Sequence, residues 1–258
     1  MGMPPTRSPA PGATVELFDR LAAAGAAGLR AWSRRLEREG LADTFWALWD
    51  LDGPSREALV VATGAAATAV AADRGRWAHE AAWAVRLAEQ HPGDAGVVVA
   101  LLLNLLRLAP GQAMFVPAGR LHAYLHGVGI EVMASSDNVV RGGLTTKHVD
   151  LVELAAVLDV SPERIEPLTP DGHSAELRYP VPAPEFAVVR QAPGAGERVV
   201  VEPHGPEILL CVGGRGCVGG IPVERGAALF VPASSGPYTL EGPAMVWRAT
   251  VGAGPATP

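Results

Sequence analysis

The sequence predicts an α+β protein in which an all-α region is followed by β-sheets, and three observations carry this prediction. Residues 13–108 place apolar side chains at helical spacing. After Pro110, short apolar runs alternate with Gly, Pro, Ser and Asn, a pattern typical of strands and tight turns. The 30 glycines and 23 prolines among 258 residues are about a fifth of the chain, against the usual ~12%, and this excess argues against a purely helical bundle.

The helical region divides into separate helices that begin and end at recognisable residues. We expect them over residues 13–40, 54–73, 76–90 and 94–106. Gly40 is a typical helix stop, and Pro54 is tolerated in the first turn of a new helix. Asp94 is expected to cap the last of the four.

The β-rich region contains one further helix and two groups of strands. The helix is expected over residues 150–158, with Asp150 as its N-cap. A proline-rich linker from Ser161 to about Pro184 follows. Short apolar runs then recur through 185–252, at a spacing typical of a β-sandwich or barrel. These runs read EFAVVRQ, ERVVVEP, EILLCVGG, AALFVPA, PYTLEG and AMVWRATV.

Composition and charge exclude several kinds of partner. Apolar residues are 48% and charged residues 19%, so the chain can bury a core. The net charge of −6 gives no basic surface for nucleic acid or an anionic membrane.

The longest apolar run, Val97 to Leu108, is too short to span a bilayer, and residues 1–12 lack the apolar core of a secretion signal. Cys211 and Cys217 are expected as free thiols, with a disulfide across a hairpin as the alternative.

An internal repeat links the two groups of strands. GQAMFVPA, which begins at Gly111, recurs as GAALFVPA, which begins at Gly226. In each copy the glycine permits a turn into a strand, Phe and Val are expected to fill the inside, and proline ends the pairing. The repeat predicts two related barrels, or one and a half.

The first copy continues into a motif that resembles the second signature of the cupin jelly roll. It is Gly111-x5-Pro117-x-Gly119-x2-His122. In that fold the histidine points into the barrel, where an imidazole suits Zn²⁺, Fe²⁺ or Mn²⁺. Taken alone, His122 has the alternative of a histidine in the barrel core. The second copy has no histidine at this place, so the second barrel is expected to be free of metal.

Residues 119–150, GRLHAYLHGVGIEVMASSDNVVRGGLTTKHVD, resemble the C-terminal active-site signature of type I phosphomannose isomerases. The resemblance implies a flexible N-terminus (1–12), a helical domain (13–108), a partial catalytic cupin (109–168) and a degenerate C-terminal cupin (180–253). Enzymes of this family use zinc to interconvert mannose 6-phosphate and fructose 6-phosphate. The resemblance therefore implies a small sugar phosphate as partner and, with the missing signal, a cytoplasmic location; the sequence leaves the oligomeric state open.

The resemblance also implies roles for five residues. His122 would be a zinc ligand, Arg141 and Glu131 catalytic residues, and Lys147 and Tyr124 residues that bind substrate. Arg141 offers planar charged donors for an oxyanion or a phosphate, and a carboxylate such as Glu131 can shuttle a proton between two carbons. Read without the family, Glu131 would be a partner in a surface ion pair and Lys147 a solvated charge.

One part of the family pattern is missing from this chain. The other zinc ligands of the family, a Gln-x-His pair and a Glu, come from an N-terminal segment that nothing here matches. We therefore expect one zinc ion with most of its ligands unaccounted for, and strands in 109–160 that lack partners. The leading hypothesis is a zinc-dependent isomerase in truncated form. The alternatives are a non-catalytic cupin that binds a sugar phosphate and a structural module.

Overall fold

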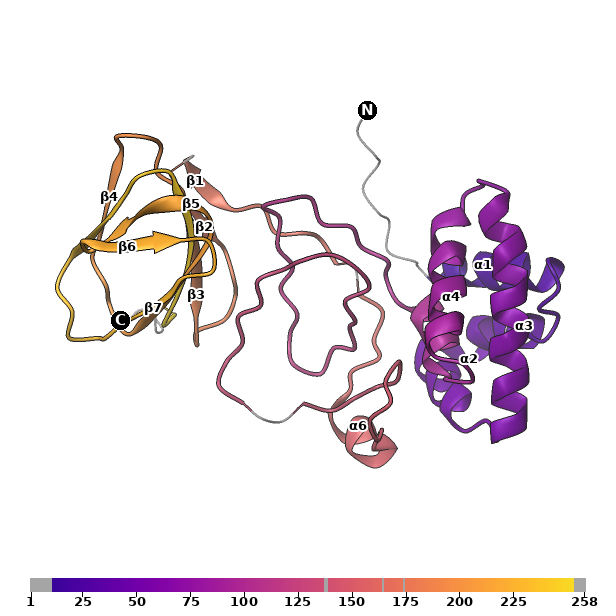
Figure 1. Ribbon diagram of the computed structural model, residues 1–258. Helices are drawn as coiled ribbons and strands as arrows, with labels where there is room; N and C mark the ends of the chain where they lie inside the picture. Colours follow the sequence, from indigo (N-terminus) through magenta and orange to yellow (C-terminus); the bar gives the residue numbers. More distant parts are fainter. Residues whose placement is uncertain (1–10, 137–138, 164, 174, 253–258) are drawn as a thin grey trace. The chain divides into compact units, whose positions relative to one another are not determined.

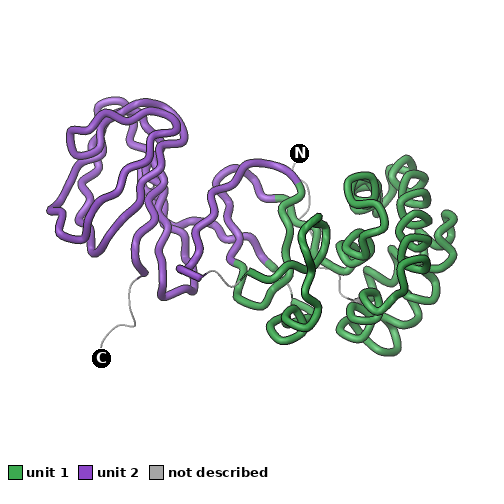
Figure 2. The backbone as a smooth tube through the Cα atoms, turned by 60° about the horizontal axis from the view of Figure 1, so that its bottom comes forward, with its two compact units in different colours: residues 1–107, 116–125, 138–165 green, residues 108–115, 126–137, 166–258 purple. Residues whose placement is uncertain are grey.

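The structure, a computed structural model, describes residues 11–136, 139–163, 165–173 and 175–252. The chain forms two compact units, which are coloured separately in Figure 2. The helical unit comprises residues 1–107, 116–125 and 138–165, and the β unit comprises 108–115, 126–137 and 166–258. This division into helices and antiparallel strands confirms the α+β fold class.

The helices of the helical unit, drawn in Figure 1, pack around one apolar core. Its helices are α1 (Pro11–Ala23), α2 (Leu29–Trp49), α3 (Gly53–Ala72), α4 (Ala78–Gln90), α5 (Gly96–Val99) with the 3₁₀ turn Ala100–Leu102, and α6 (Leu151–Val157). Phe18, Leu21, Leu29, Phe45 and Leu48 are among the fully buried side chains at its centre. None of the described helices combines the length and the apolar character that crossing a bilayer requires.

Local signals account for some of the helix ends in this unit. Asp150 caps α6 as predicted, because its carboxylate accepts the backbone N–H groups of Val152 and Glu153 at 3.0 Å. The prediction of one helix over 13–40 was wrong, since the chain turns between α1 and α2. Gly40 has non-helical backbone angles (φ 86°, ψ −177°) and marks a kink that divides α2 into two helical segments, so the helix stop expected there is confirmed. The helix expected through Leu106 ends at Leu102.

The β unit is a curled antiparallel sheet that fits the cupin jelly roll. Its strands are β1 (Asp171–His173), β2 (Glu176–Tyr179), β3 (Ala187–Gln191), β4 (Arg198–Val201), β5 (Glu207–Val218), β6 (Ile221–Glu224), β7 (Ala228–Val231), β8 (Tyr238–Glu241) and β9 (Ala244–Thr250). They are ordered β1-β2-β3-β9-β5-β8-β4, and β6 and β7 also pair with β5. The core between them contains Leu209, Cys211, Val218, Val223, Leu240, Ala244 and Val246.

The β unit differs from the sequence prediction in two respects. Strands β1 and β2 lie in the segment expected to be a linker. In the second repeat Phe230 is 66% exposed, while Leu229 packs against the core, so the expectation that Phe fills the inside was wrong. The strand β7 has its register set by pairing with β5, which turns the side chain of Phe230 outward. The expectation that Cys211 and Cys217 are free thiols is confirmed, and both residues lie on β5.

Most of residues 109–150 do not form the strands expected of a partial barrel. Their described part makes a single isolated bridge, between Ala113 and Leu168. Several of its large apolar side chains are exposed, among them Tyr124, Val128, Met133 and Val139. A strand needs a neighbour to satisfy its backbone N–H and C=O groups, and no other described strand pairs with this segment. The described part of this segment is therefore irregular chain with turns and bends rather than a sheet.

Candidate functional site

The first half of the candidate site is a short loop of the helical unit that is attached to the end of α6. Gly119 has a φ of 76°, and a methyl group at this position would lie 2.6 Å from the carbonyl oxygen of Val157. Its carbonyl oxygen accepts the backbone N–H of Asp159 at 2.8 Å. Glycine is therefore required here for both its backbone conformation and its lack of a side chain.

Arg120 holds the same loop from the other side. Its guanidinium group pairs with Asp159 at 3.0 Å and with Glu163 at 3.2 Å, and it donates to the carbonyl of Ser161 at 3.1 Å. Hydrogen bonds from the side chain and backbone of Ser161, with the charge of Arg120, lower the pKa of the Asp159 carboxyl. The loop before His122 is thus fixed by charge-assisted bonds.

His122 is exposed, and one of its ring nitrogens is already engaged. Nδ1 lies 3.1 Å from the carbonyl oxygen of Arg120. Because a carbonyl only accepts, this bond places the proton on Nδ1 and leaves the Nε2 lone pair for another partner. Histidines that ligate metals are commonly oriented by such a bond. The ring of Tyr124 meets the imidazole edge to face, with centroids 5.7 Å apart.

The second half of the site packs against the first. Gly142 lies against the side chain of Leu121, so closely that a methyl group at Gly142 would clash with it. His122 and Arg141, both exposed, are each one residue away from this contact. The structure thus brings together the two backbone segments that carry these residues.

The chain after Arg141 is anchored on the helical core. A methyl group at Gly143 would lie 2.8 Å from the Trp49 ring and 3.2 Å from Gly96. Leu144 has a φ of 51°, which is uncommon for a branched side chain, and it packs against the core. The contact of Gly143 with Trp49 and the packing of Leu144 on the core hold the strained backbone of Leu144 in place.

Lys147 and Glu131 have different positions in the structure. Lys147 is exposed in the helical unit, and its backbone N–H donates to the hydroxyl of Thr145 at 3.1 Å. Glu131 is exposed and belongs to the β unit, whereas the other four candidate residues belong to the helical unit. Asp137 and Asn138, which are part of the family signature, lie outside the described residues.

The described residues do not by themselves fit a zinc ion. Catalytic zinc usually takes about three protein ligands, and this site offers the single imidazole of His122. No group of three His, Cys, Asp or Glu side chains in the described part of the chain is arranged to hold a metal.

Sequence reasoning missed two residues that support the site. Arg120 fixes the loop through partners that lie 39 and 43 positions further along the chain. Trp49 packs on Gly143 from the helical core. Arg120 lies within the family signature, and this position could have suggested a supporting role for it. Nothing in the sequence around Trp49 distinguishes it from an ordinary core residue.

Comparison with known proteins identifies relatives, although no family model matches the chain. The mannose-6-phosphate isomerase of Salmonella typhimurium is 37% identical over 162 residues, which are 60% of this chain and 41% of that protein. That of Rattus norvegicus is 39% identical over 163 residues, 58% of this chain and 38% of that protein. The chain therefore spans less than half the length of these curated relatives.

Solved structures give the same relationship over more of the chain. The Salmonella typhimurium mannose 6-phosphate isomerase bound to fructose 6-phosphate and zinc matches with a TM-score of 0.78 and 28% identity. The match covers 95% of this chain and 62% of that one. The apo form of the same protein also matches with a TM-score of 0.78.

Proposed function

Since the chain is related in sequence and in fold to the mannose-6-phosphate isomerases, we propose that it is part of an aldose–ketose isomerase. Its reaction would interconvert mannose 6-phosphate and fructose 6-phosphate. Residues 109–168 would be the part of the catalytic cupin that this chain supplies, between a helical domain (13–108) and a degenerate C-terminal cupin (180–253). We expect it to act in the cytoplasm.

The contact between Leu121 and Gly142 is the observation that carries this proposal. It joins the loop of His122 to the segment of Arg141, so an imidazole and a permanently charged guanidinium extend from adjacent backbone segments. Arg141 would bind the phosphate or an oxyanion of the sugar through paired N–H donors. Lys147 would add a second cation, and Tyr124 would contact the sugar beside His122.

The chemistry requires a proton to leave one carbon of the sugar and to reach the next. A base removes the proton from C2 of the aldose, the electrons form the C1–C2 double bond, and the C1 oxygen takes up a proton to give an enediol. The C2 hydroxyl then loses its proton and becomes the carbonyl as the base returns its proton to C1. Glu131 is the carboxylate that we propose for this transfer. Arg141 would stabilise the negative charge that develops on oxygen.

We propose that His122 is one ligand of a zinc ion and that the remaining ligands come from outside the described residues. The hydrogen bond from Nδ1 to the Arg120 carbonyl supports this role, because it presents Nε2 as the free donor atom. Bound zinc would polarise the carbonyl oxygen of the sugar. The described part of 109–150, which makes one isolated bridge and has several exposed apolar side chains, supports the idea that further strands complete this half of the barrel.

A non-catalytic module that binds a sugar phosphate is the second candidate function. The observation that favours it is that His122 is the single metal ligand found among the described residues of the site.

Two measurements separate the candidates: the zinc content of the purified chain and a coupled isomerase assay. Both measurements are made with the chain alone and with the N-terminal segment of the Salmonella typhimurium relative added to it. Zinc uptake and turnover that Arg141→Ala abolishes are expected for the isomerase. Binding of fructose 6-phosphate without turnover in either sample would favour the module.

A further inference from the structure

Arg141 and Lys147 lie at the two ends of one turn of the helical unit, and neither is fixed by regular secondary structure. Both side chains are exposed, so their positions depend on the backbone that carries them. Residues 143–147 are bends rather than a helix or a strand. The separation of the two cations is therefore set by the contacts that hold this turn.

Trp49 closes on the middle of the turn. It is the last residue of α2 and is 9% exposed. A methyl group at Gly143 would lie 2.8 Å from Cη2 and 3.2 Å from Cζ2 of the indole. Gly143 has a φ of 109°, which favours glycine, and its lack of a side chain leaves this space to the ring. The outer edge of the indole therefore packs directly on the backbone of the turn.

The backbone at the start of α5 contacts the same turn. A methyl group at Gly143 would lie 3.2 Å from Cα of Gly96, and a methyl group at Gly96 would lie 2.9 Å from the backbone nitrogen of Leu144. Oδ1 of Asp94 accepts the backbone N–H of Gly96 at 2.7 Å and so fixes this part of α5. Glycine at both positions allows the two backbones to approach this closely.

The turn transmits the position of Gly143 to both cations. Leu144 has a φ of 51° and packs against the helical core. The hydroxyl oxygen of Thr145 then accepts the backbone N–H of Lys147 at 3.1 Å. In the other direction, one residue separates Gly143 from Arg141. A shift of the backbone at Gly143 therefore moves Arg141 and Lys147 together.

We propose that Trp49 is a positioning residue of the isomerase site and that it sets the separation of Arg141 and Lys147 for the sugar phosphate. This inference rests on the proposed function of that site. Trp49 acts through Gly143 and not by touching the substrate. The affinity for the phosphorylated sugar depends on the edge of the indole, because two charge-assisted contacts require both cations in place at once.

The test is Trp49→Phe in the purified chain. Phenylalanine keeps an aromatic ring but lacks the outer edge of the indole. Nε1 of Trp49 has no hydrogen-bond partner among the described residues, so the change breaks no such bond. We expect Kd for fructose 6-phosphate, measured by calorimetry, to rise about tenfold. The amide NMR signals of Arg141 and Lys147 should shift in the same variant without ligand.

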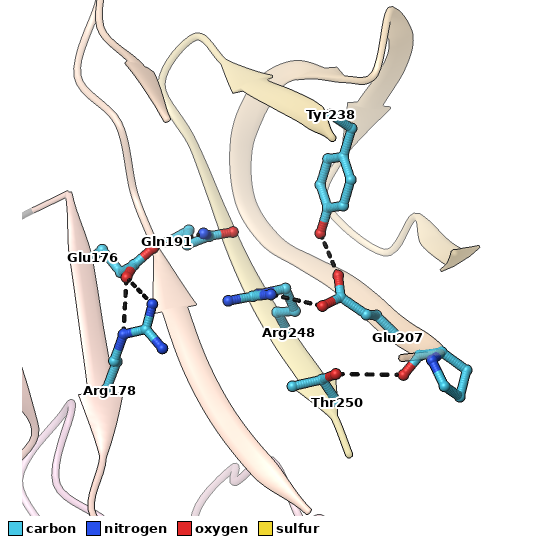
Figure 3. A network of polar contacts seen from close by, with 8 residues as sticks. Glu176, Arg178, Gln191, Glu207, Tyr238, Arg248 and Thr250 are labelled. Carbon is cyan, nitrogen blue, oxygen red and sulfur yellow. Dashed lines mark hydrogen bonds and ion pairs between the residues drawn. The ribbon is translucent and has the colours of Figure 1, made fainter. Parts of the chain in front are cut away.

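Two control variants separate positioning from a general loss of stability. Trp46→Phe makes the same change one turn earlier in α2, where the ring meets Phe45 edge to face with centroids 4.8 Å apart. Tyr238→Phe removes a hydroxyl that donates to Glu207 at 2.6 Å in the β unit (Figure 3). Both variants should lower the free energy of unfolding, and both should leave Kd and the two amide signals unchanged.

Gly96→Ala presses on the same turn from α5 and provides the test if Trp49→Phe does not fold. It should also raise Kd. Wild-type affinity in Trp49→Phe, or in Gly96→Ala where that variant replaces it, would overturn the proposal. An equal rise of Kd in Trp49→Phe and Trp46→Phe would overturn it too, because it would reflect a general loss of packing.

A wild-type chain that does not bind fructose 6-phosphate would contradict the proposed isomerase site itself. The amide signals then decide about Trp49 separately. Unshifted signals of Arg141 and Lys147 in Trp49→Phe would show that Trp49 does not hold the turn.

Discussion

Leu121 and Gly142 are in contact in the helical unit, and the absence of a side chain at Gly142 is what permits their approach. The contact joins two segments that are separated by about 20 residues and that carry His122 and Arg141. Both segments also pack on the helical core, through Leu121, Leu125, Val140 and Leu144. The helical unit therefore acts as the support on which this half of the site is assembled.

Gly142→Ala should loosen the contact between these two segments. The added methyl group displaces the flexible end of the Leu121 side chain, and we expect a loss of stability of about 1 kcal/mol. Chemical denaturation followed by far-UV circular dichroism measures it. Gly75→Ala is the matched control, since a methyl group there meets nothing within 4 Å. Equal stability of both variants would show that the contact is loose.

Arg120→Ala should free the loop that precedes His122. The variant loses two ion pairs and the bonds to carbonyl groups, and partly exposed pairs of this kind contribute about 1 kcal/mol. The backbone N–H of Asp159, which donates to Gly119, should then exchange with solvent faster. Hydrogen exchange at this amide is the measurement. Arg215→Ala, which removes an exposed pair at 3.6 Å, should leave the exchange rate of Asp159 unchanged.

Glu207→Ala should destabilise the β unit strongly. It leaves the Arg248 guanidinium buried without its anion and the Tyr238 hydroxyl without its acceptor, a change that typically costs about 3–5 kcal/mol. Denaturation monitored by near-UV circular dichroism reports the loss. The double variant Glu207→Leu with Arg248→Met removes both charges and should be less damaging than the single change. A double variant that is as unstable as Glu207→Ala would contradict this account.

Glu176 should make the β unit sensitive to acid. Burial opposes ionisation of its carboxyl, but hydrogen bonds from Gln191 and Arg178 and the charges of Arg178 and Arg248 outweigh it and lower the pKa. Because the folded pKa lies below the ordinary glutamate value of 4.5, this stabilisation is present above that value. It is lost as the pH falls through the folded pKa. The free energy of unfolding, measured from pH 7 down to about pH 3, should fall less steeply in Glu176→Gln than in the wild type.

The helices were predictable where the signal is local. Asp150 caps α6 and Pro54 lies in the first turn of α3, and both signals depend on residues within one turn. Strands β1 and β2 were missed because Asp171-Gly172-His173 and its neighbour have no clear alternation of apolar residues. Their pairing with each other and with β3 makes them strands, and a local pattern does not encode such pairing.

The sequence could suggest candidate site residues but not the contacts that support them. The signature predicts His122 and Arg141 as site residues, and this stays a prediction; the structure shows that the Leu121–Gly142 contact joins their segments. The contacts of Trp49 with Gly143 and of Arg120 with Glu163 connect residues far apart in the sequence, so periodicity gives no sign of them. The expected strands of 109–150 are absent for a related reason: their apolar pattern is present, but the described chain offers no strand to pair with it.

Calorimetry of fructose 6-phosphate binding to the purified chain tests most directly whether His122 and Arg141 belong to one sugar-phosphate site. The measurement is made for the wild type, His122→Ala, Arg141→Ala and the control Arg215→Ala. If one site uses both residues, Arg141→Ala should raise Kd at least about tenfold, since it removes a charge-assisted contact to the sugar phosphate. His122→Ala should also weaken binding, and the control should bind like the wild type. Binding that is unchanged in both His122→Ala and Arg141→Ala would contradict a shared sugar-phosphate site.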